Sequence, residues 1–299
     1  MESLQATTAG IARETGDSVL GIGRGIRGAG VVVDDGLVLT NAHNLRGREV
    51  TVTYPDSSTA TAAVAGVDPD GDLAVLRVDT RGARAPGWGE PPELGAPLWS
   101  LARTSDAGLR VTTGAVSATG RGFRGPRGRR IVGAFEHTTP LARGSSGSPV
   151  LDEDGHLVGL NTHRIGDGFY LAVVADADLR RRVDALCAGE SPRRRSLGIA
   201  IAPPPVARKL RRSVGLSERD GLLVRDADPD GPAGRAGIES GDLLVRAGSR
   251  DLTSVDDLHA ALDGLGDVDT LDLRVVRGEA ERDVRVTFSE VEPSSEGPA

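Results

Sequence analysis

The sequence predicts a mainly β protein built from two domains. Its 299 residues are enough for two domains of ordinary size. With 41 glycines, turns should be frequent, and short runs rich in valine, leucine and threonine recur between them. Aromatic residues make up only 3%, so the core must consist mostly of aliphatic side chains. About ten short strands between residues 19 and 175 predict a barrel or a pair of barrels.

The composition argues against several functional classes. The net charge of -7 and the pI of about 5.4 argue against nucleic acid as the main partner, because phosphate binding needs a basic surface. Cys187 is the only cysteine, so an intramolecular disulfide is impossible, and we expect neither a metal site nor a cofactor. Nothing approaches the roughly 18 apolar residues of a membrane span, and the first residues do not resemble a secretory signal. As written, the chain is expected to be cytoplasmic; a truncated N-terminus would allow a periplasmic or other extracytoplasmic location.

The elements of the first domain follow from turn residues and alternating apolar positions. Residues 1–18 read as a short helix or arm. Asp34-Asp35-Gly36 predicts a hairpin turn between strands 31–33 and 37–40. Residues 80–97 read as a loop and 178–187 as a terminal helix. The remaining strands are expected at 49–54, 60–67, 73–78, 98–101, 110–117, 131–137, 150–151, 157–161 and 169–174.

A second domain follows a linker over residues 189–195. We expect domains at 1–188 and 196–290 and a disordered polar tail at 291–299. Ser254 should cap a helix with Asp257 as its capping-box partner, and Leu258 and Leu262 mark the apolar face of that helix. The other elements are strands at 197–201, 222–225, 242–245, 271–276 and 282–288 and a short helix at 232–237.

The stretch Gly144-Ser145-Ser146-Gly147-Ser148-Pro149 has the features of a nucleophile turn. Glycine takes positive φ without strain, so the two glycines permit a tight turn that exposes the serine between them. The N–H groups of Gly144 and Ser146 could then form an oxyanion hole. Ser145 and Ser148 are alternatives, but only Ser146 has a glycine two residues before it to supply the second donor.

A serine needs a base and an orienting carboxylate. His43 follows a predicted strand, and Asp72 begins another after a tight turn. The order His43, Asp72, Ser146 is that of chymotrypsin-type proteases. Asp68 and Asp70 compete with Asp72, but their turn predicts solvent exposure. His137, His156, His163 and His259 are expected to be structural or exposed, with His163 a candidate for the substrate pocket.

Three blocks resemble the catalytic blocks of the HtrA/Deg-type serine proteases. They are Leu39-Thr40-Asn41-Ala42-His43, Gly71-Asp72-Leu73-Ala74-Val75-Leu76 and the nucleophile turn, while residues 197–288 are similar to the PDZ domain of that family. The resemblance implies a chymotrypsin-like double β-barrel followed by a small α+β PDZ domain. It also implies ATP-independent, PDZ-regulated cleavage of unfolded or partly folded proteins, and a homotrimer in many members.

The resemblance also implies binding residues. Pro140, six residues before Ser146, would lie at the bottom of the specificity pocket, which predicts a preference for small or medium aliphatic residues rather than Lys or Arg. Peptide C-termini are expected to bind as an added strand in the PDZ domain. The other expected pocket residues are Asn161, Thr162, His163, Phe169 and Leu171. The expected peptide-binding residues are Ser196, Leu197, Gly198, Ile199, Ile201, Leu258 and Leu262.

Two alternative interpretations remain open at this point. The arginine-rich run 121–130 could suggest RNA, although a solvated surface loop that adjusts active-site order fits the acidic chain better. The alternative to an enzyme is a catalytically silent chaperone or adaptor that binds exposed C-termini. The intact set of His43, Asp72 and Ser146 disfavours it.

Overall fold

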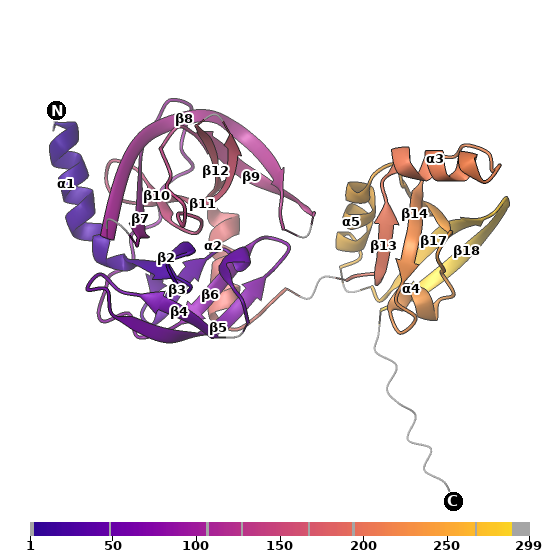
Figure 1. Ribbon diagram of the computed structural model, residues 1–299, viewed down its shortest axis with the longest axis horizontal. Helices are drawn as coiled ribbons and strands as arrows, with labels where there is room; N and C mark the ends of the chain where they lie inside the picture. Colours follow the sequence, from indigo (N-terminus) through magenta and orange to yellow (C-terminus); the bar gives the residue numbers. More distant parts are fainter. Residues whose placement is uncertain are drawn as a thin grey trace, which may run out of the picture. The chain divides into compact units, whose positions relative to one another are not determined.

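The chain divides into two compact units, residues 1–192 and 193–299, which are described separately below. The division falls within the predicted linker 189–195. The computed structural model describes residues 3–47, 49–105, 108–126, 128–166, 168–192, 195–266 and 268–288 (Figure 1). The predicted tail 291–299 lies outside the described residues.

Six strands close the first barrel, in the order β1-β2-β3-β6-β5-β4. Alternate residues serve two cores: Val38 packs inside a cluster of this barrel, whereas Leu37 and Leu39 join a cluster that includes residues of both barrels. The expected hairpin over Asp34-Asp35-Gly36 is confirmed, with Gly36 at φ +71°. The strands are β1 (Val19–Ile22), β2 (Gly28–Asp34), β3 (Leu37–Thr40), β4 (Glu49–Thr53), β5 (Thr59–Asp68) and β6 (Leu73–Arg77).

A second barrel follows, with the strand order β10-β11-β12-β9-β8-β7. Phe135 is its largest fully buried side chain, and Leu98, Val150 and Val158 pack around it. The predicted pair of barrels is therefore confirmed. The strands are β7 (Pro97–Thr104), β8 (Gly108–Arg124), β9 (Arg130–His137), β10 (Pro149–Leu151), β11 (Leu157–Gly166) and β12 (Phe169–Val174).

The β8–β9 hairpin corrects the expected loop over residues 121–130. β8 continues through Arg124, and Phe123 pairs with Ile131 across the hairpin. Arg129, near its tip, is 7% exposed and lies 3.9 Å from Asp70. The sequence concealed this extension because alternating arginine and glycine carry little strand propensity.

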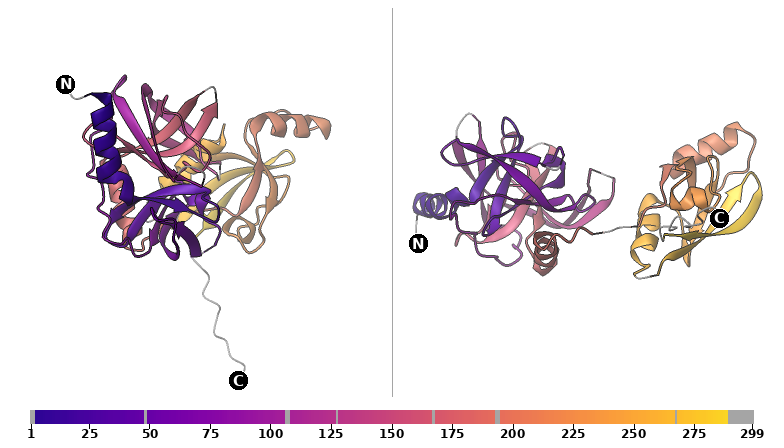
Figure 2. Two further views of the ribbon diagram at one scale, coloured as in Figure 1. Left: turned by 60° about the vertical axis from the view of Figure 1, so that its left-hand side comes forward. Right: turned by 90° about the horizontal axis from the view of Figure 1, so that it is seen from below.

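Two longer helices pack against the barrels of the first unit. Helix α1 (Leu4–Thr15) is capped by Ser3, and Thr8 accepts a hydrogen bond from the Trp99 indole at 2.9 Å. The short helix η1 (Gly16–Ser18) follows α1 directly. The short helix η2 (Ala42–Asn44) follows Asn41, which has an extended backbone. Helix α2 (Ala177–Cys187) packs its buried leucine and valine positions against β5 and β6 (Figure 2).

The second unit is an antiparallel sheet in the order β13-β14-β15-β17-β18, with β16 paired to β15. The capping box at Ser254 and Asp257 is confirmed. Helix α3 was not among the expected elements, although proline is favoured in a first helical turn. The elements are β13 (Ile199–Ala202), α3 (Pro204–Ser213), β14 (Leu222–Ala227), α4 (Pro232–Arg235), β15 (Leu243–Ala247), β16 (Arg250–Asp251), α5 (Val255–Asp263), β17 (Thr270–Arg277) and β18 (Ala280–Thr287).

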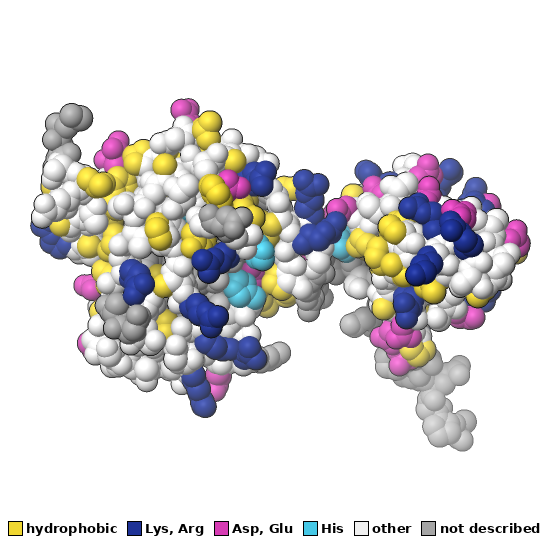
Figure 3. Space-filling view, turned by 45° about the horizontal axis from the view of Figure 1, so that its top comes forward, with side chains coloured by type: hydrophobic (Ala, Val, Ile, Leu, Met, Phe, Trp, Pro, Cys, Tyr) yellow, Lys and Arg dark blue, Asp and Glu magenta, His cyan; other side chains and the backbone are white. Residues whose placement is uncertain are grey.

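Two further features concern the surface. Among the described residues, no helix combines the length and the apolar character needed to cross a membrane. On one face of the first unit, basic side chains gather close to histidine side chains (Figure 3).

Candidate active site

His43 and Asp72 are brought together by a strand pair. His43 lies in η2, which follows β3, and Asp72 immediately precedes β6. β3 and β6 are antiparallel neighbours, with Thr40 opposite Ala74. The end of one strand and the beginning of the other therefore lie at the same edge, which places the two side chains side by side.

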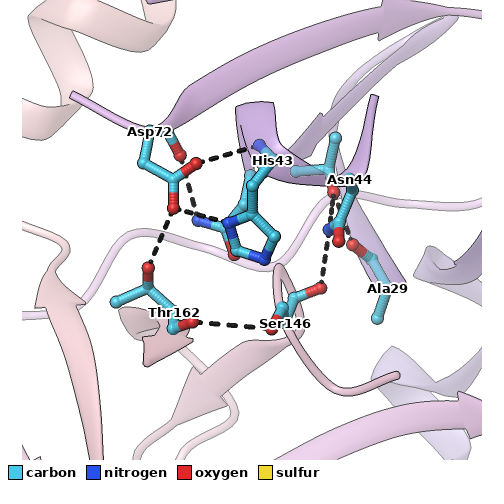
Figure 4. Close-up of polar contacts among 8 residues, drawn as sticks. Ala29, His43, Asn44, Asp72, Ser146 and Thr162 are labelled. Atoms are coloured by element: carbon cyan, nitrogen blue, oxygen red, sulfur yellow. Dashed lines mark hydrogen bonds and ion pairs between the residues drawn. The ribbon is translucent and has the colours of Figure 1, made fainter. Parts of the chain in front are cut away.

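The histidine and the aspartate form a short, doubly hydrogen-bonded pair. His43 Nδ1 lies 2.7 Å from Asp72 Oδ2, and the His43 backbone N–H donates to Asp72 Oδ1 at 3.0 Å. Thr162 Oγ1 also donates to Asp72 Oδ2, at 3.2 Å (Figure 4). The Asp72 side chain is 3% exposed and that of His43 is 32% exposed. A proton held on Nδ1 leaves the Nε2 lone pair of the neutral ring free to act as a base.

Asp72 occupies a backbone conformation that few residues other than glycine adopt. Its φ is +55°, which aspartate tolerates better than most side chains. Asn41 Nδ2 donates a hydrogen bond to the backbone carbonyl oxygen of Asp72 at 3.0 Å. Asp68 Oδ1 accepts a hydrogen bond from the Gly71 N–H at 2.9 Å. Asp68 was expected to be solvated, but it is 1% exposed and lies 3.0 Å from Arg182 Nη2. Its carboxylate is buried because it organises the turn that presents Asp72.

The nucleophile turn requires glycine at both flanking positions. Gly144 and Gly147 have φ of +87° and +85°. A Cβ on Gly144 would lie 2.7 Å from the carbonyl oxygen of Ile26, and one on Gly147 would lie 2.3 Å from that of Ala29. Any larger residue would therefore strain the backbone and also collide with the first barrel.

Two donors from the first barrel hold the carbonyl oxygen of Ser146. Ala29 N–H donates to it at 2.8 Å and Asn44 Nδ2 at 2.9 Å (Figure 4). The Ser146 hydroxyl faces the other way and lies 3.5 Å from the carbonyl oxygen of Thr162. Within the described chain it makes no hydrogen bond to His43, as is common for catalytic pairs without substrate.

The backbone N–H groups around Ser146 fall into two pairs, one bonded within the described chain and one not. Ser145 N–H donates to Ala142 O at 3.3 Å and Gly147 N–H to Asn161 O at 2.7 Å. Among the described residues, the N–H groups of Gly144 and Ser146 donate to no protein acceptor. They are thus available to a negatively charged oxygen beside the Ser146 hydroxyl.

A cavity of about 170 Å³ adjoins Ser146. Asn161, Thr162 and His163 line it as expected, but Pro140, Phe169 and Leu171 do not. Side chains of a strand alternate between faces, so Tyr170 points into the cavity while its two neighbours point away. Pro140 is exposed, and the loop enters the cavity only at the next residue. The complete lining is Leu141, Ala142, Arg143, Gly144, Ser145, Ser146, Asn161, Thr162, His163, Arg164 and Tyr170.

A buried polar network supports the nucleophile turn from behind. Asn161 Nδ2 donates to Ser148 Oγ at 2.9 Å, and Asn161 Oδ1 lies 2.9 Å from His137 Nε2. Thr139 N–H donates to His137 Nδ1 at 3.3 Å, so the ring is neutral with its proton on Nε2. Burial lowers the pKa of His137 from its ordinary value of 6.5 to about 4, against smaller opposing effects of Asn161 and Glu136.

The residues expected to bind a peptide lie on and around β13, an edge strand of the described sheet. Among the described residues this strand pairs with β14 alone, and Ile199 and Ile201 are partly buried on it. Leu258 and Leu262 of α5 are 4% and 6% exposed, so both belong to the core with Leu197. Ser196 Oγ accepts from Gly198 N–H at 3.2 Å, which organises the turn before the strand.

The sequence did not identify three residues that hold the site. Asn41 and Asn44 flank the histidine turn, and each places a buried side-chain amide on a backbone carbonyl of a catalytic candidate. Their position beside His43 was the available signal. His137 offered none, because its role depends on partners far away in the sequence. The described residues contain no cluster of three His, Cys, Asp or Glu side chains suited to a metal ion.

This fold and this site define a trypsin-like peptidase domain followed by a PDZ domain. A family model described as a trypsin-like peptidase domain matches residues 28–160, and a PDZ domain model matches residues 208–288. A protein from Halomonas elongata, named as a probable periplasmic DegP-like serine endoprotease, is 31% identical over 279 residues, which cover 90% of this chain and 58% of that protein. The chloroplastic Protease Do-like 1 of Arabidopsis thaliana is 31% identical over 286 residues, covering 87% of this chain and 63% of that protein.

Solved structures show the same fold. The serine endoprotease from Yersinia pestis matches with a TM-score of 0.67 and 23% identity over 98% of this chain and 100% of that one. The HtrA-type protease AlgW with a decapeptide matches with a TM-score of 0.67 and 21% identity over 94% and 97%. The chain therefore combines a trypsin-like peptidase domain with a PDZ domain and is similar to the HtrA/Deg-type proteases. It spans about three fifths of the length of the two curated relatives.

Proposed function

We propose that the chain is an ATP-independent serine endopeptidase that cleaves unfolded or partly folded proteins. The observation that carries the proposal is the His43–Asp72 pair, 2.7 Å between Nδ1 and Oδ2, beside a serine on a glycine-flanked turn. Buried Asp72 holds the histidine in the tautomer that a base requires. A silent adaptor would have no need for this arrangement, nor for two unused N–H groups beside the serine.

The reaction proceeds through an acyl-enzyme. Ser146 exchanges its contact with Thr162 for one with His43, loses its proton to Nε2, and its Oγ bonds to the substrate carbonyl carbon. The N–H groups of Gly144 and Ser146 stabilise the resulting oxyanion. His43 then protonates the leaving nitrogen and the peptide bond breaks. A water, deprotonated by His43, releases the acid and restores the Ser146 hydroxyl.

The cavity supports a preference for small or medium aliphatic side chains before the cleaved bond. Its lining contains no carboxylate, and Arg143 and Arg164 contribute to it. A substrate lysine or arginine would enter it without a partner and beside like charge. Its volume of about 170 Å³ fits an aliphatic side chain of modest size.

Peptide C-termini are proposed to bind in the second unit by strand addition to β13. The free edge of β13 and the partly buried Ile199 and Ile201 support this role. Because Leu258 and Leu262 are already buried, the peptide would contact the edge of α5 rather than an open apolar groove.

Labelling with a fluorophosphonate tests the proposal directly. We expect the wild type to be labelled and Ser146→Ala to be unlabelled and inactive on a denatured protein substrate. Ser145→Ala serves as the matched control, because it removes a neighbouring hydroxyl and should retain the label. Absence of labelling and cleavage in the wild type would instead support the adaptor.

The compartment and the assembly are further proposals. The name of the Halomonas elongata relative places that protein in the periplasm, and we propose an extracytoplasmic location for this chain as well. The expectation of a cytoplasmic protein is not confirmed. We also propose a homotrimer, which light scattering of the purified protein would test.

A further inference from the structure

A basic cavity lies on the first barrel beside the nucleophile turn. It has a volume of about 410 Å³. Arg24, Arg27 and Arg46 contribute three exposed cations, and Glu49 is the only acid in the lining. Within the described chain, none of these arginines forms an ion pair with a carboxylate. The complete lining is Gly23, Arg24, Arg27, Arg46, Glu49, Val50, Thr51 and Thr61.

The walls of this cavity continue into the segments that hold Ser146. Arg27 lies two residues before Ala29, whose N–H contacts the Ser146 carbonyl. Arg46 lies two residues after Asn44, which contacts the same carbonyl oxygen. Adjacent Ile26 directs its carbonyl at Gly144, where a Cβ would lie 2.7 Å away. The cavity is therefore a neighbour of the reacting groups and not a remote surface feature.

The side of Ser146 on which these segments lie identifies the part of the substrate they face. Figure 4 shows Ser146 between Thr162 on one side and Asn44 and Ala29 on the other. The Thr162 side belongs to the cavity proposed for the residue before the cleaved bond. His43 must protonate the leaving nitrogen, so the departing chain passes η2 and the start of β2.

The reach of an extended substrate fits this path. Arg46 lies three residues beyond His43, just past the end of η2, and three residues of an extended substrate span about 10 Å. The second and third residues after the cleaved bond would thus come within range of the arginine side chains. Three cations without a carboxylate partner among the described residues repel one another, and an acidic side chain placed among them relieves that repulsion.

We propose that Arg24, Arg27 and Arg46 form a subsite that selects acidic side chains at the second and third positions after the cleaved bond. The proposal rests on the proposed function, since it assigns the leaving side of that same site. It makes acidic stretches in unfolded proteins the preferred substrates. Basic stretches should be cleaved poorly, because they would meet like charge.

Quenched-fluorescence peptides that share the same residues before the cleaved bond test the subsite. Those shared residues are first chosen from the cleavage sites that mass spectrometry identifies in a digested denatured protein. Three peptides then carry Asp-Glu, Asn-Gln or Lys-Lys at the two positions. We expect kcat/KM for the acidic peptide to exceed that of the amide peptide by about three- to tenfold at low salt, as exposed charge pairs allow. The advantage should shrink near 1 M salt, where the Debye length is about 3 Å.

Charge-removing variants separate the subsite from general electrostatics. The double variant Arg27→Gln with Arg46→Gln should cleave acidic and amide peptides equally while retaining activity on the amide peptide. Arg84→Gln, an exposed arginine outside this lining, should keep the full preference. Equal cleavage of acidic and amide peptides by an active wild type would overturn the subsite and leave the protease standing. No cleavage and no fluorophosphonate labelling would overturn both.

Discussion

Acid should weaken the first unit through His137. The ring is fully buried and neutral, and both of its nitrogens already have partners. A second proton on Nδ1 would point at the N–H of Thr139, so protonation would exchange a hydrogen bond for repulsion between two donors. In the unfolded chain the same ring takes up a proton freely near its ordinary pKa of 6.5.

The sign and the size of the effect follow from this difference in pKa. Between pH 6.5 and about 4 the unfolded chain binds a proton at His137 that the folded chain does not. The stabilising contribution is therefore present above pH 6.5 and is lost as the pH falls. At 1.36 kcal/mol per pKa unit it amounts to about 3 kcal/mol in full, of which about 2 kcal/mol is lost between pH 7.5 and 5.

Tryptophan fluorescence during denaturant unfolding reports this loss of stability for the first unit specifically, because both tryptophans, Trp88 and Trp99, belong to that unit. His137→Gln keeps an amide donor but has no group that titrates in this range. We expect the wild type to lose about 2 kcal/mol more than this variant between pH 7.5 and 5. Equal losses in the two proteins, or an NMR titration placing the His137 pKa near 6.5, would refute the reasoning.

Three further substitutions have defined outcomes. Gly147→Ala would place a Cβ 2.3 Å from the Ala29 carbonyl oxygen, so peptide hydrolysis should fall by about 100-fold; near-normal turnover would contradict the glycine requirement. Thr162→Val removes one hydrogen bond to Asp72 and should lower kcat by about five- to tenfold with KM unchanged, as steady-state kinetics would reveal. Ser254→Ala removes the helix cap and should cost the second unit about 1 kcal/mol in denaturant unfolding, without altering hydrolysis of a short peptide.

Local patterns predicted most of the fold and the candidate catalytic residues. The hairpin at Asp34-Asp35-Gly36 and the cap at Ser254 depend on neighbours within a few residues, so the sequence displays them directly. The β8–β9 extension and helix α3 were missed because arginine, glycine and proline conceal regular structure when tertiary packing overrides propensity.

The pocket shows where sequence reasoning fails. Phe169 and Leu171 were expected to line the pocket, but Tyr170 lines it instead. The register of β12 decides which of these alternating side chains faces the cavity. Asp68 was assigned to solvent from its Pro/Gly-rich turn, whereas Arg182, 114 residues away, makes its burial possible. Both errors arose from partners that are distant along the chain.

The sequence alone determined the chemical groups of this protein: a serine between two glycines, a histidine after one strand and an aspartate before another. Those choices are local, because turn geometry and strand periodicity depend on adjacent residues. Only the tertiary structure decided what holds and surrounds them. The amides of Asn41 and Asn44 and the neutral ring of His137 act through contacts with distant segments, and the cavity that gathers Arg24, Arg27 and Arg46 is likewise formed only once those segments are packed together.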